Sequence, residues 1–586
     1  MNETLHLRAR ELGVQREYED VDQVTHVADD EVVERVVEIL DDDRTAGHAA
    51  LVDPIHVVAP SASGGATNGR TVFVGVSVDD ASLLVDGSPV RVDRSADRMS
   101  VELPHDLPFG CHTLSIEAGA STDECLVVVA PPTMPGLSTD RRWSSLFVPA
   151  YALWEDSDPL PSFSHLGDVS RRIGARGIDM LATLPLYATF LDDPYDPSPY
   201  SPISRLHWNE VYLDDARLPA APAPTPGPMV DWRALGRRRR KQLVAAAHAA
   251  DQATLDRIDQ FALVHPDVGA YARFRAGREA NGDEIVERSH VLAQMLCDEQ
   301  LAEIATADGA AGLSLDLPIG SHPSGYEVWA YPDLFAPATA VGAPPDTFFT
   351  DGQNWGFPPQ LPGEMRRTGY QLWRQMIERA GRHAAMLRID HVMAVHRLWW
   401  VPDGVTADRG VYVRYPHDEM LAVISASAAA AGVAVVGENL GTVPPEVVAA
   451  LDAVEMLGMF EEQFVTGDSP LPAVPERTVA GIRTHDMAAF AEHVATTDLS
   501  GYRRELARAG EDVQTDLVDA ALSRLVHSDA RMVVADLDDL LDETRPHNLP
   551  GRVVPGIWQR RLDRPISETF ADPTVARRLD ILERTH

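Results

Sequence analysis

Short apolar runs alternate with helix-length segments over most of this chain. Each run is rich in valine, isoleucine and leucine, which is typical of a strand buried in a parallel sheet. A strand followed by a helix, repeated around a closed sheet, predicts an α/β fold of the (β/α)8 TIM-barrel type. We predict the eight barrel strands near residues 146–149, 180–185, 313–319, 387–391, 433–438, 456–460, 479–484 and 532–537.

The chain ahead of the barrel follows other periodicities. Residues 1–50 are polar and partly helical, with valines spaced along one face of a helix. Residues 51–132 alternate apolar and polar positions between turn signals, which predicts a small β-sandwich-like module. Residues 133–586 then make the barrel with its insertions, and about 215–300 are interpreted as a helical insertion.

Three of the predicted barrel strands end in a carboxylic acid. Asp390, Glu438 and Asp486 close the apolar runs LRIDHVM, AVVGENL and TVAGIRTHD, and 48 residues separate each acid from the next. Each acid alone fits equally well as the cap of the helix that follows its strand. Together they predict an active site on one rim of the barrel, and converging carboxylates suggest glycosidic chemistry.

The charge of the chain narrows the choice of partner. Among 586 residues, 51 are basic and 89 are acidic, which gives a formal net charge of −38. Such a surface repels nucleic acid and anionic membranes, so a neutral substrate is expected. Lys241 is the only lysine and lies in a basic run on a helix that we expect to be solvated, so neither a phosphate-binding GK[ST] loop nor a convincing Schiff-base lysine is available.

The cysteines and the N-terminus predict a reducing location. Cys111, Cys125 and Cys297 form no CxxC pair, so no zinc cluster or redox motif is expected. A hairpin centred near Ala118 would place Cys111 across from Cys125, but we expect these thiols to stay reduced. The first residues lack a signal-peptide core, and no apolar stretch is long enough to span a membrane. We therefore expect a cytoplasmic protein.

The segments around the three acids resemble the catalytic segments of the 4-α-glucanotransferase family, the amylomaltases of the α-amylase clan. These segments are RIDHVMAVHRLWWVP, VVGENLGTVPPEV and RTHDMAAF. Further segments are similar to family segments in the same order along the chain. They are SPYSPISRLHWNEVYLD from Ser198, LDLPIGSHPSGYEVWAYPDLF from Leu315, VGAPPDTFFTDGQNWGFPP from Val341, HNLPG at His547 and WQRRL at Trp558.

The resemblance implies an enzyme that passes an α-1,4-glucanosyl segment from a maltodextrin to the 4-hydroxyl of another glucan or of glucose. It implies Asp390 as the nucleophile, Glu438 as the acid and base, and Asp486 as a group that binds sugar hydroxyls and favours the distorted ring. Arg388, two residues before Asp390, would lie on the same side of its strand and keep that carboxylate ionised. No metal or organic cofactor is implied.

A wider set of residues is expected to bind the glucan. Hydroxyl-bonding side chains and aromatic faces suit a neutral sugar, which has polar edges and apolar faces. Either of the two histidines in the set fits a structural role as well. The candidates are Arg388, His391, His485, Tyr200, Asp316, Gln353, Asn354, Trp355 and Phe348.

The sequence departs from the commonest family pattern at Glu327, Asn439 and Met487, none of which is a proposed catalytic group. These departures leave open the preferred donor, the preferred acceptor and the ratio of transfer to hydrolysis. A retaining hydrolase of the same clan and a catalytically inactive glucan-binding protein are the alternatives. The oligomeric state and the role of the β-module are also open.

Overall fold

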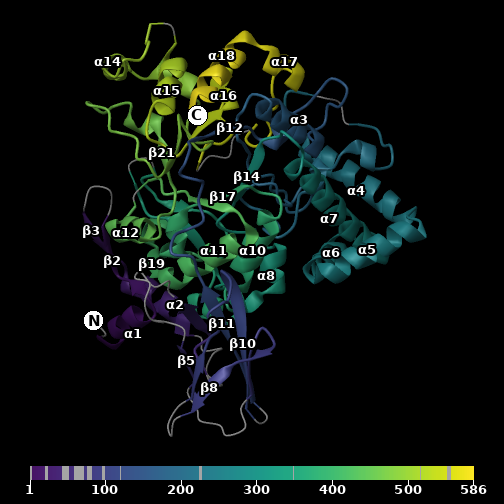
Figure 1. Cartoon of the computed structure of the whole chain (residues 1–586), viewed down its shortest axis with the longest axis vertical. Helices are drawn as coiled ribbons and strands as arrows, with labels where there is room; N and C mark the ends of the chain where they lie inside the picture. Colours follow the sequence, from purple (N-terminus) through teal and green to yellow (C-terminus); the bar gives the residue numbers. More distant parts are fainter. Residues whose placement is uncertain are drawn as a thin grey trace.

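The computed structural model describes most of the chain and divides it into three visible parts (Figure 1). A β-rich N-terminal part lies at one end, the barrel occupies the middle, and a group of helices projects to one side. Among the residues described, no helix combines the length and the apolarity needed to cross a membrane. The described residues are 3–19, 24–41, 52–58, 71–74, 82–94, 99–118, 121–223, 227–346, 349–441, 443–514, 516–550 and 556–585.

The barrel is an eight-stranded parallel sheet, and each of its strands lies at one of the predicted positions. The sheet runs in the order β20-β17-β14-β13-β12-β23-β22-β21, and a parallel bridge between Val436 and Leu457 joins the two outer strands. The TIM-barrel prediction is therefore confirmed. The strands are β12 (Trp143–Phe147), β13 (Met180–Ala182), β14 (Gly312–Leu317), β17 (Met386–Ile389), β20 (Ala434–Gly437), β21 (Gly458–Glu461), β22 (Thr478–Gly481) and β23 (Met532–Asp536).

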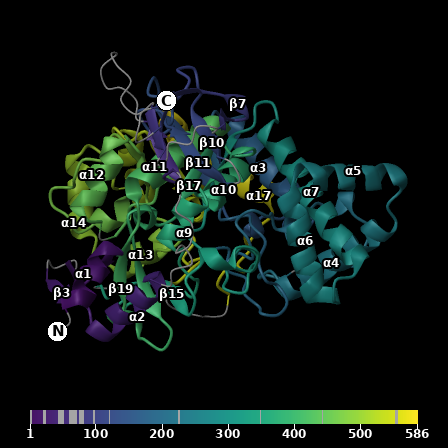
Figure 2. The same cartoon turned by 90° about the horizontal axis from the view of Figure 1, so that it is seen from below.

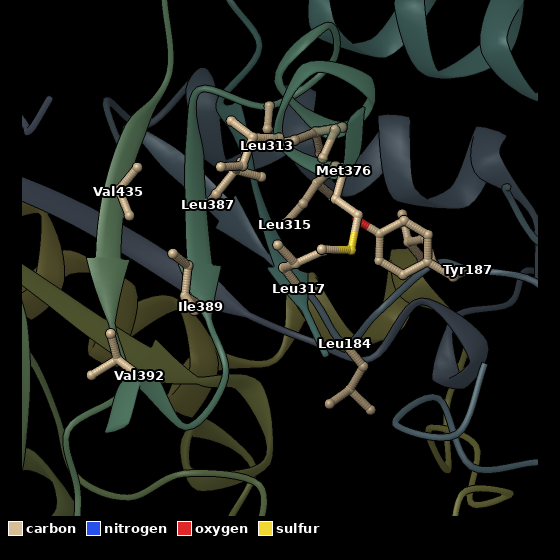
Figure 3. Packing of buried hydrophobic residues seen from close by; sticks show 14 of the residues in the cluster. Leu184, Tyr187, Leu313, Leu315, Leu317, Met376, Leu387, Ile389, Val392 and Val435 are labelled. Carbon is tan, nitrogen blue, oxygen red and sulfur yellow. The ribbon is translucent and has the colours of Figure 1, made fainter. Parts of the chain in front are cut away.

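Alternation along each strand decides which side chains reach the barrel interior. The leucines of β14 pack outward into the main apolar core, and Leu387 and Ile389 of β17 do the same (Figure 3). Helix α10 (Gln371–Gly381) covers this face. Asp316 and Arg388, at the intervening positions, line a cavity inside the barrel instead. The period of two thus sends polar groups inward while the apolar groups hold the helices.

Helices of two kinds surround this sheet. Four of them form the projecting group at the right of Figure 1. Each of α4, α5 and α7 begins after an aspartate whose carboxylate accepts a backbone N–H of the first turn. The four are α4 (Trp232–His248), α5 (Gln252–Val264), α6 (Pro266–Ala280) and α7 (Glu284–Ala305). Helices of the barrel itself include α3 (Phe163–Gly174), α8 (Tyr326–Ala330), α11 (His417–Ala431), α12 (Pro445–Ala453), α15 (Leu517–Val526) and α18 (Pro573–Leu582).

The predicted β-module is a sandwich of two sheets. Its core contains buried valines, leucines and isoleucines contributed by both sheets. Part of the alternating run that begins at Val72 lies outside the described residues. One sheet has the order β4-β11-β10-β6-β7, from β4 (Ile55–Val58), β11 (Ser121–Val129), β10 (Gly110–Ala118), β6 (Ser82–Val85) and β7 (Ser88–Pro89). The other is β5-β9-β8, from β5 (Thr71–Val74), β9 (Met99–Glu102) and β8 (Arg91–Arg94).

The N-terminal segment is joined to the barrel region. Strand β1 (Val14–Gln15) pairs with β19 (Val411–Arg414), and the valines of helix α2 (Asp30–Asp41) belong to the same apolar core as the barrel. Helix α11 packs against β10 and β11 of the sandwich, as the view in Figure 2 also shows. The five-stranded sheet that contains β1 continues through β18 (Arg397–Pro402), β15 (Thr339–Ala343) and β16 (Gln353–Asn354).

The expected position of Cys111 in the hairpin is wrong. In the β10–β11 pair, Cys111 faces Val128, and Cys125 faces Leu114. The error arises because β10 continues to Ala118 before the chain turns, which moves the register by three residues. The three cysteines are free thiols.

Candidate active site

Strand register places an arginine beside two of the predicted site carboxylates. Asp316 of β14 and Arg388 of β17 are Cα partners in the parallel ladder. Nη1 of Arg388 therefore reaches both carboxylate oxygens of Asp316, at 2.7 and 2.9 Å, and also Oδ1 of Asp390 at 3.1 Å. The hydroxyl of Tyr200 donates to Asp316 at 2.5 Å. Four of the predicted site residues thus form one connected group.

Glu438 is anchored by backbone N–H groups next to Asp390. The N–H of His391 donates to Oε2 of Glu438 at 2.7 Å, and that of Leu440 donates to Oε1 at 3.1 Å. His391 adopts the left-handed conformation with φ of 45°, a strain of about 1–3 kcal/mol for a residue with a Cβ. Gly437 makes the close approach possible, because a Cβ there would lie 2.8 Å from Val392. The loop after β17 is therefore shaped to hold the carboxylate that follows β20.

Asp486 belongs to the same site through its neighbours. Its carboxylate lies 3.2 Å from Nε2 of His485 and accepts a hydrogen bond of 2.6 Å from the amide of Asn548. The ring of His485 stacks on Tyr200 with centroids 5.0 Å apart and an interplanar angle of 7°. Tyr200 in turn bonds to Asp316, so the three predicted acids and Asp316 converge on one end of the barrel. The Asp486 side chain is 41% exposed, which leaves it free to meet a ligand.

Asp390 and Asp486 differ in their pKa values. Burial raises the pKa of Asp390 to about 7; Arg388 opposes this rise, while the charges of Asp316, Glu438 and Asp486 add to it. Partial burial would also raise the pKa of Asp486. The interaction with His485 and the hydrogen bond from Asn548 outweigh it, and the pKa of Asp486 falls to about 2. Asp486 is therefore a permanent charge, whereas Asp390 titrates near neutrality.

Of the predicted loop residues that the structure describes, Trp355 contacts the site, whereas Gln353 and Asn354 bond only within their own loop. Trp355 makes an edge contact with the ring of His391, with centroids 5.1 Å apart, which places its indole beside the acids. Gln353 and Asn354 form the short strand β16, and their side-chain hydrogen bonds stay within the loop. Gln353 accepts from the indole of Trp355 at 3.4 Å, and Asn354 accepts from the N–H of Gly356 at 2.9 Å. Phe348 lies outside the described residues.

Several groups around the site escaped the sequence analysis. Asn548 lies in the HNLPG segment, but no spacing indicated that it would bond to Asp486. Beneath the acids, a cavity of about 80 Å³ is lined by Glu461, Arg483 and Asp536 as well as Arg388. Arg483 pairs with Asp536 at 3.1 Å, and burial raises the pKa of Glu461 well above its usual range. The only sequence signal for these three residues is that each is charged and lies in or next to a barrel strand.

The three departures from the family pattern have structural partners. The Glu327 carboxylate is fully buried in an ion pair of 2.8 Å with Arg205, and Arg205 also donates to the carbonyl of Ile319 at 2.7 Å, just beyond β14. Asn439 accepts the backbone N–H of Met459 at 2.8 Å, which ties the end of β20 to β21. Met487 accepts a contact of 3.5 Å from the N–H of Thr484 through its sulfur. Each departure thus supports a rim segment.

Comparison with known proteins identifies the family. Residues 274–567 match the profile described as 4-alpha-glucanotransferase, and residues 12–131 match that of the MalQ N-terminal beta sandwich domain. A 4-alpha-glucanotransferase of Mycobacterium tuberculosis is 31% identical over 558 residues, covering 77% of this chain and 76% of that protein. The chain belongs to the 4-alpha-glucanotransferase family. The family prediction is confirmed, and the enzyme is a transglycosidase.

Solved structures agree with the fold of this glucanotransferase. The amylomaltase from Corynebacterium glutamicum superposes with a TM-score of 0.84 at 21% identity and covers 99% of both chains. The amylomaltase from Streptococcus agalactiae, solved in complex with acarbose, superposes with a TM-score of 0.67 at 21% identity, over 75% of this chain and 98% of that one. A match over the full length includes the sandwich and the projecting helices as well as the barrel.

Proposed function

We propose that this glucanotransferase works on maltooligosaccharides with Asp390 as nucleophile and Glu438 as acid and base. The observation that carries the assignment is the bond from the His391 N–H to Glu438, because it fixes the second carboxylate beside the first. Retaining transfer needs two such neighbouring carboxyl groups, at about 5–5.5 Å. A carboxylate held by two N–H donors has a defined orientation toward the scissile oxygen.

The reaction then runs in two displacements. An oxygen of Asp390 attacks the anomeric carbon while the Glu438 carboxylic acid gives its proton to the leaving 4-oxygen. This step breaks the α-1,4 bond and forms a glycosyl ester on Asp390. Glu438, now a carboxylate, takes the proton from the 4-hydroxyl of the acceptor glucan, whose oxygen attacks the same carbon and displaces Asp390. The new bond has the α configuration of the old one.

The other predicted residues take supporting roles in the proposal. Arg388 lies against Asp390 and offsets the burial that opposes its ionisation. Asp486, ionised and partly exposed, accepts hydrogen bonds from sugar hydroxyls and stabilises the positive charge that develops on the ring. Trp355, beside His391, offers an apolar wall for a sugar face. The free thiols fit a reducing compartment, and we propose the cytoplasm as the location.

Transfer is expected to dominate over hydrolysis on pure maltotriose. Glucose and longer maltooligosaccharides should appear together, while the number of reducing ends stays nearly constant. We expect the loop that brings Trp355 beside His391 to limit the access of water to the intermediate. An ordered acceptor then has an effective concentration of up to about 10⁵ M in the best intramolecular cases. Chromatography of the products together with a reducing-end assay tests this. A rise in reducing ends that matches the bonds cleaved would favour the hydrolase alternative.

The pKa of Asp390 predicts an acid limb close to neutrality. Attack requires the carboxylate, so kcat/KM on maltotriose should fall about tenfold per pH unit below the pKa of about 7. Asp316→Asn removes one of the charges that raise this pKa and leaves Arg388 to Asp390 alone, so its limb should move to lower pH. Initial rates between pH 4.5 and pH 9, a window of about two pH units on either side of the Asp390 pKa, would measure the acid limbs of both enzymes. Identical limbs in the two enzymes would contradict the assignment.

A further inference from the structure

A groove lies on the outer side of the barrel, away from the proposed catalytic residues. Its volume is about 490 Å³, within the range of about 300–1,000 Å³ that is common for ligand sites. One wall is the elbow where α5 ends and α6 begins, and the other consists of α8 and α10. Helices α6 and α8 contact each other along its floor, in the region to the right of α8 in Figure 1. The groove is thus enclosed by two parts of the fold.

An aromatic side chain stands exposed in this groove. Trp329 is 55% exposed although it is one of the largest apolar side chains of the protein. Tyr326 and Phe274 support it from behind, with ring centroids at 6.0 and 5.4 Å. Val264, which is 59% exposed, also lines the groove. A supported aromatic face is the surface on which the apolar face of a sugar ring packs.

The charges that line the groove are compensated. Arg382 pairs with Glu378 at 2.9 Å, and Asp267 lies 3.5 Å from Nε2 of His207. Arg379 lies 3.7 Å from Asp298. Because each charge has an opposite neighbour, an anion such as a sugar phosphate gains little here over a neutral ligand. Two neutral amides, Gln371 and Gln375, complete the polar lining.

Arg379 has two guanidinium nitrogens without a hydrogen-bond partner in the described part of the chain, but neither is open to the groove. The residue is only 5% exposed, and its Nε and Nη2 have no hydrogen-bond partner among the described residues. Both nitrogens are themselves covered by protein atoms, and the guanidinium lies over the ring of Phe261, 5.9 Å from its centroid. Arg379 therefore supports the wall of the groove, and the hydroxyl-binding groups that remain open to a ligand are the two glutamine amides.

We propose that this groove is a second glucan-binding site, in which Trp329 carries a sugar face and the two glutamines bind hydroxyls. Its ligand class rests on the proposed function, since the neutral glucan is the substrate of that site. A long α-1,4-glucan would bind at the groove and present another of its segments to the catalytic acids. Such double attachment raises the effective concentration of long donors and leaves short ones unaffected.

Calorimetry with maltoheptaose tests the proposal in the full chain with Asp390→Asn, which prevents turnover. The stoichiometry should be about two per chain, and Trp329→Ala should reduce it to about one. Trp329→Tyr, which keeps an aromatic face, should restore the second site. Phe109→Ala is the matched control, because Phe109 is 52% exposed but belongs to the sandwich. A stoichiometry of one before substitution, or no change on Trp329→Ala, would overturn the proposal.

Kinetics of the active enzyme give an independent readout. Trp329→Ala should keep the initial rate on maltotriose within about twofold and lower kcat/KM on amylose by about fivefold or more. Equal losses on both substrates would mean that the groove has only a structural role. Failure of the catalytic proposal would appear differently, as the absence of maltotriose disproportionation in the unsubstituted enzyme with the calorimetric stoichiometry unchanged.

Discussion

Replacing Asp390 with asparagine should lower the rate on maltotriose by at least about a thousandfold while the fold stays intact. Asparagine has nearly the same volume, and its carbonyl oxygen can still accept the hydrogen bond that Arg388 now gives to Asp390. An amide cannot form the glycosyl ester, so the covalent step is lost. Initial rates of glucose release measure the effect, and the melting temperature and maltoheptaose affinity show whether the site is preserved.

Asp408→Asn is the matched control for this substitution. It makes the same chemical change in an exposed residue, in the short helix Ala407–Arg409 that joins β18 and β19 outside the barrel sheet. Its activity should stay within about twofold of the unsubstituted enzyme, as is usual for surface changes. If Asp390→Asn retained a tenth of the activity, Asp390 would not be the nucleophile, and the two-displacement mechanism would have to be assigned to another group.

The barrel was predictable because its strands obey a simple rule. Residues that alternate between core and interior produce a readable period, and the apolar outward positions of β14 and β17 are continuous with those of the neighbouring strands. The same rule places Arg388 and Asp390 on one side of a strand. The pairing of Arg388 with Asp316 could not be predicted, because it depends on the register between two strands, and the two residues are 72 positions apart in the sequence. Register is a property of the closed sheet.

Other features of the site depend on contacts between distant loops. The left-handed backbone of His391 gives no sequence signal, because histidine adopts this conformation only when its surroundings require it. Asn548 reaches Asp486 from the chain that follows β23, the neighbour of β22 in the sheet, and 62 residues separate the two side chains in the sequence. The position of Cys111 was missed because the hairpin was centred on Ala118, whereas Ala118 pairs with Ser121 and the turn lies between them.

The N-terminal segment shows where periodicity alone misleads about independence. The helical valines near Val33 were correctly assigned to one face, but a pattern does not say which surface covers that face. In the structure the face is covered by the same core that holds the barrel, and β1 extends a sheet whose other strands come from residues 339–414. A segment can therefore have its own periodicity and still be stable only in contact with another part of the chain.

Removing the Glu438 carboxyl should separate the two displacements. Both of its oxygens accept backbone N–H groups, so the amide of Glu438→Gln would turn an NH2 toward one donor and tilt. Glu438→Ala avoids this conflict and leaves space for a small nucleophile. For Glu438→Ala we expect the rate on maltotriose to fall by about 10²–10⁴-fold, because the 4-oxygen leaves without a proton.

Donor and nucleophile choice then identify the step that was lost. The fluoride ion of α-glucosyl fluoride leaves without acid assistance, so Glu438→Ala should still form the glycosyl ester and accumulate it. Azide needs no base and should release the ester as α-glucosyl azide, with retained configuration, because it attacks the face opposite Asp390. Asp390→Ala should instead convert α-glucosyl fluoride to the β-azide in one inverting step. If the rates of Glu438→Ala on fluoride and maltotriose fell equally and azide gave no product, Glu438 would not be the acid and base of this enzyme.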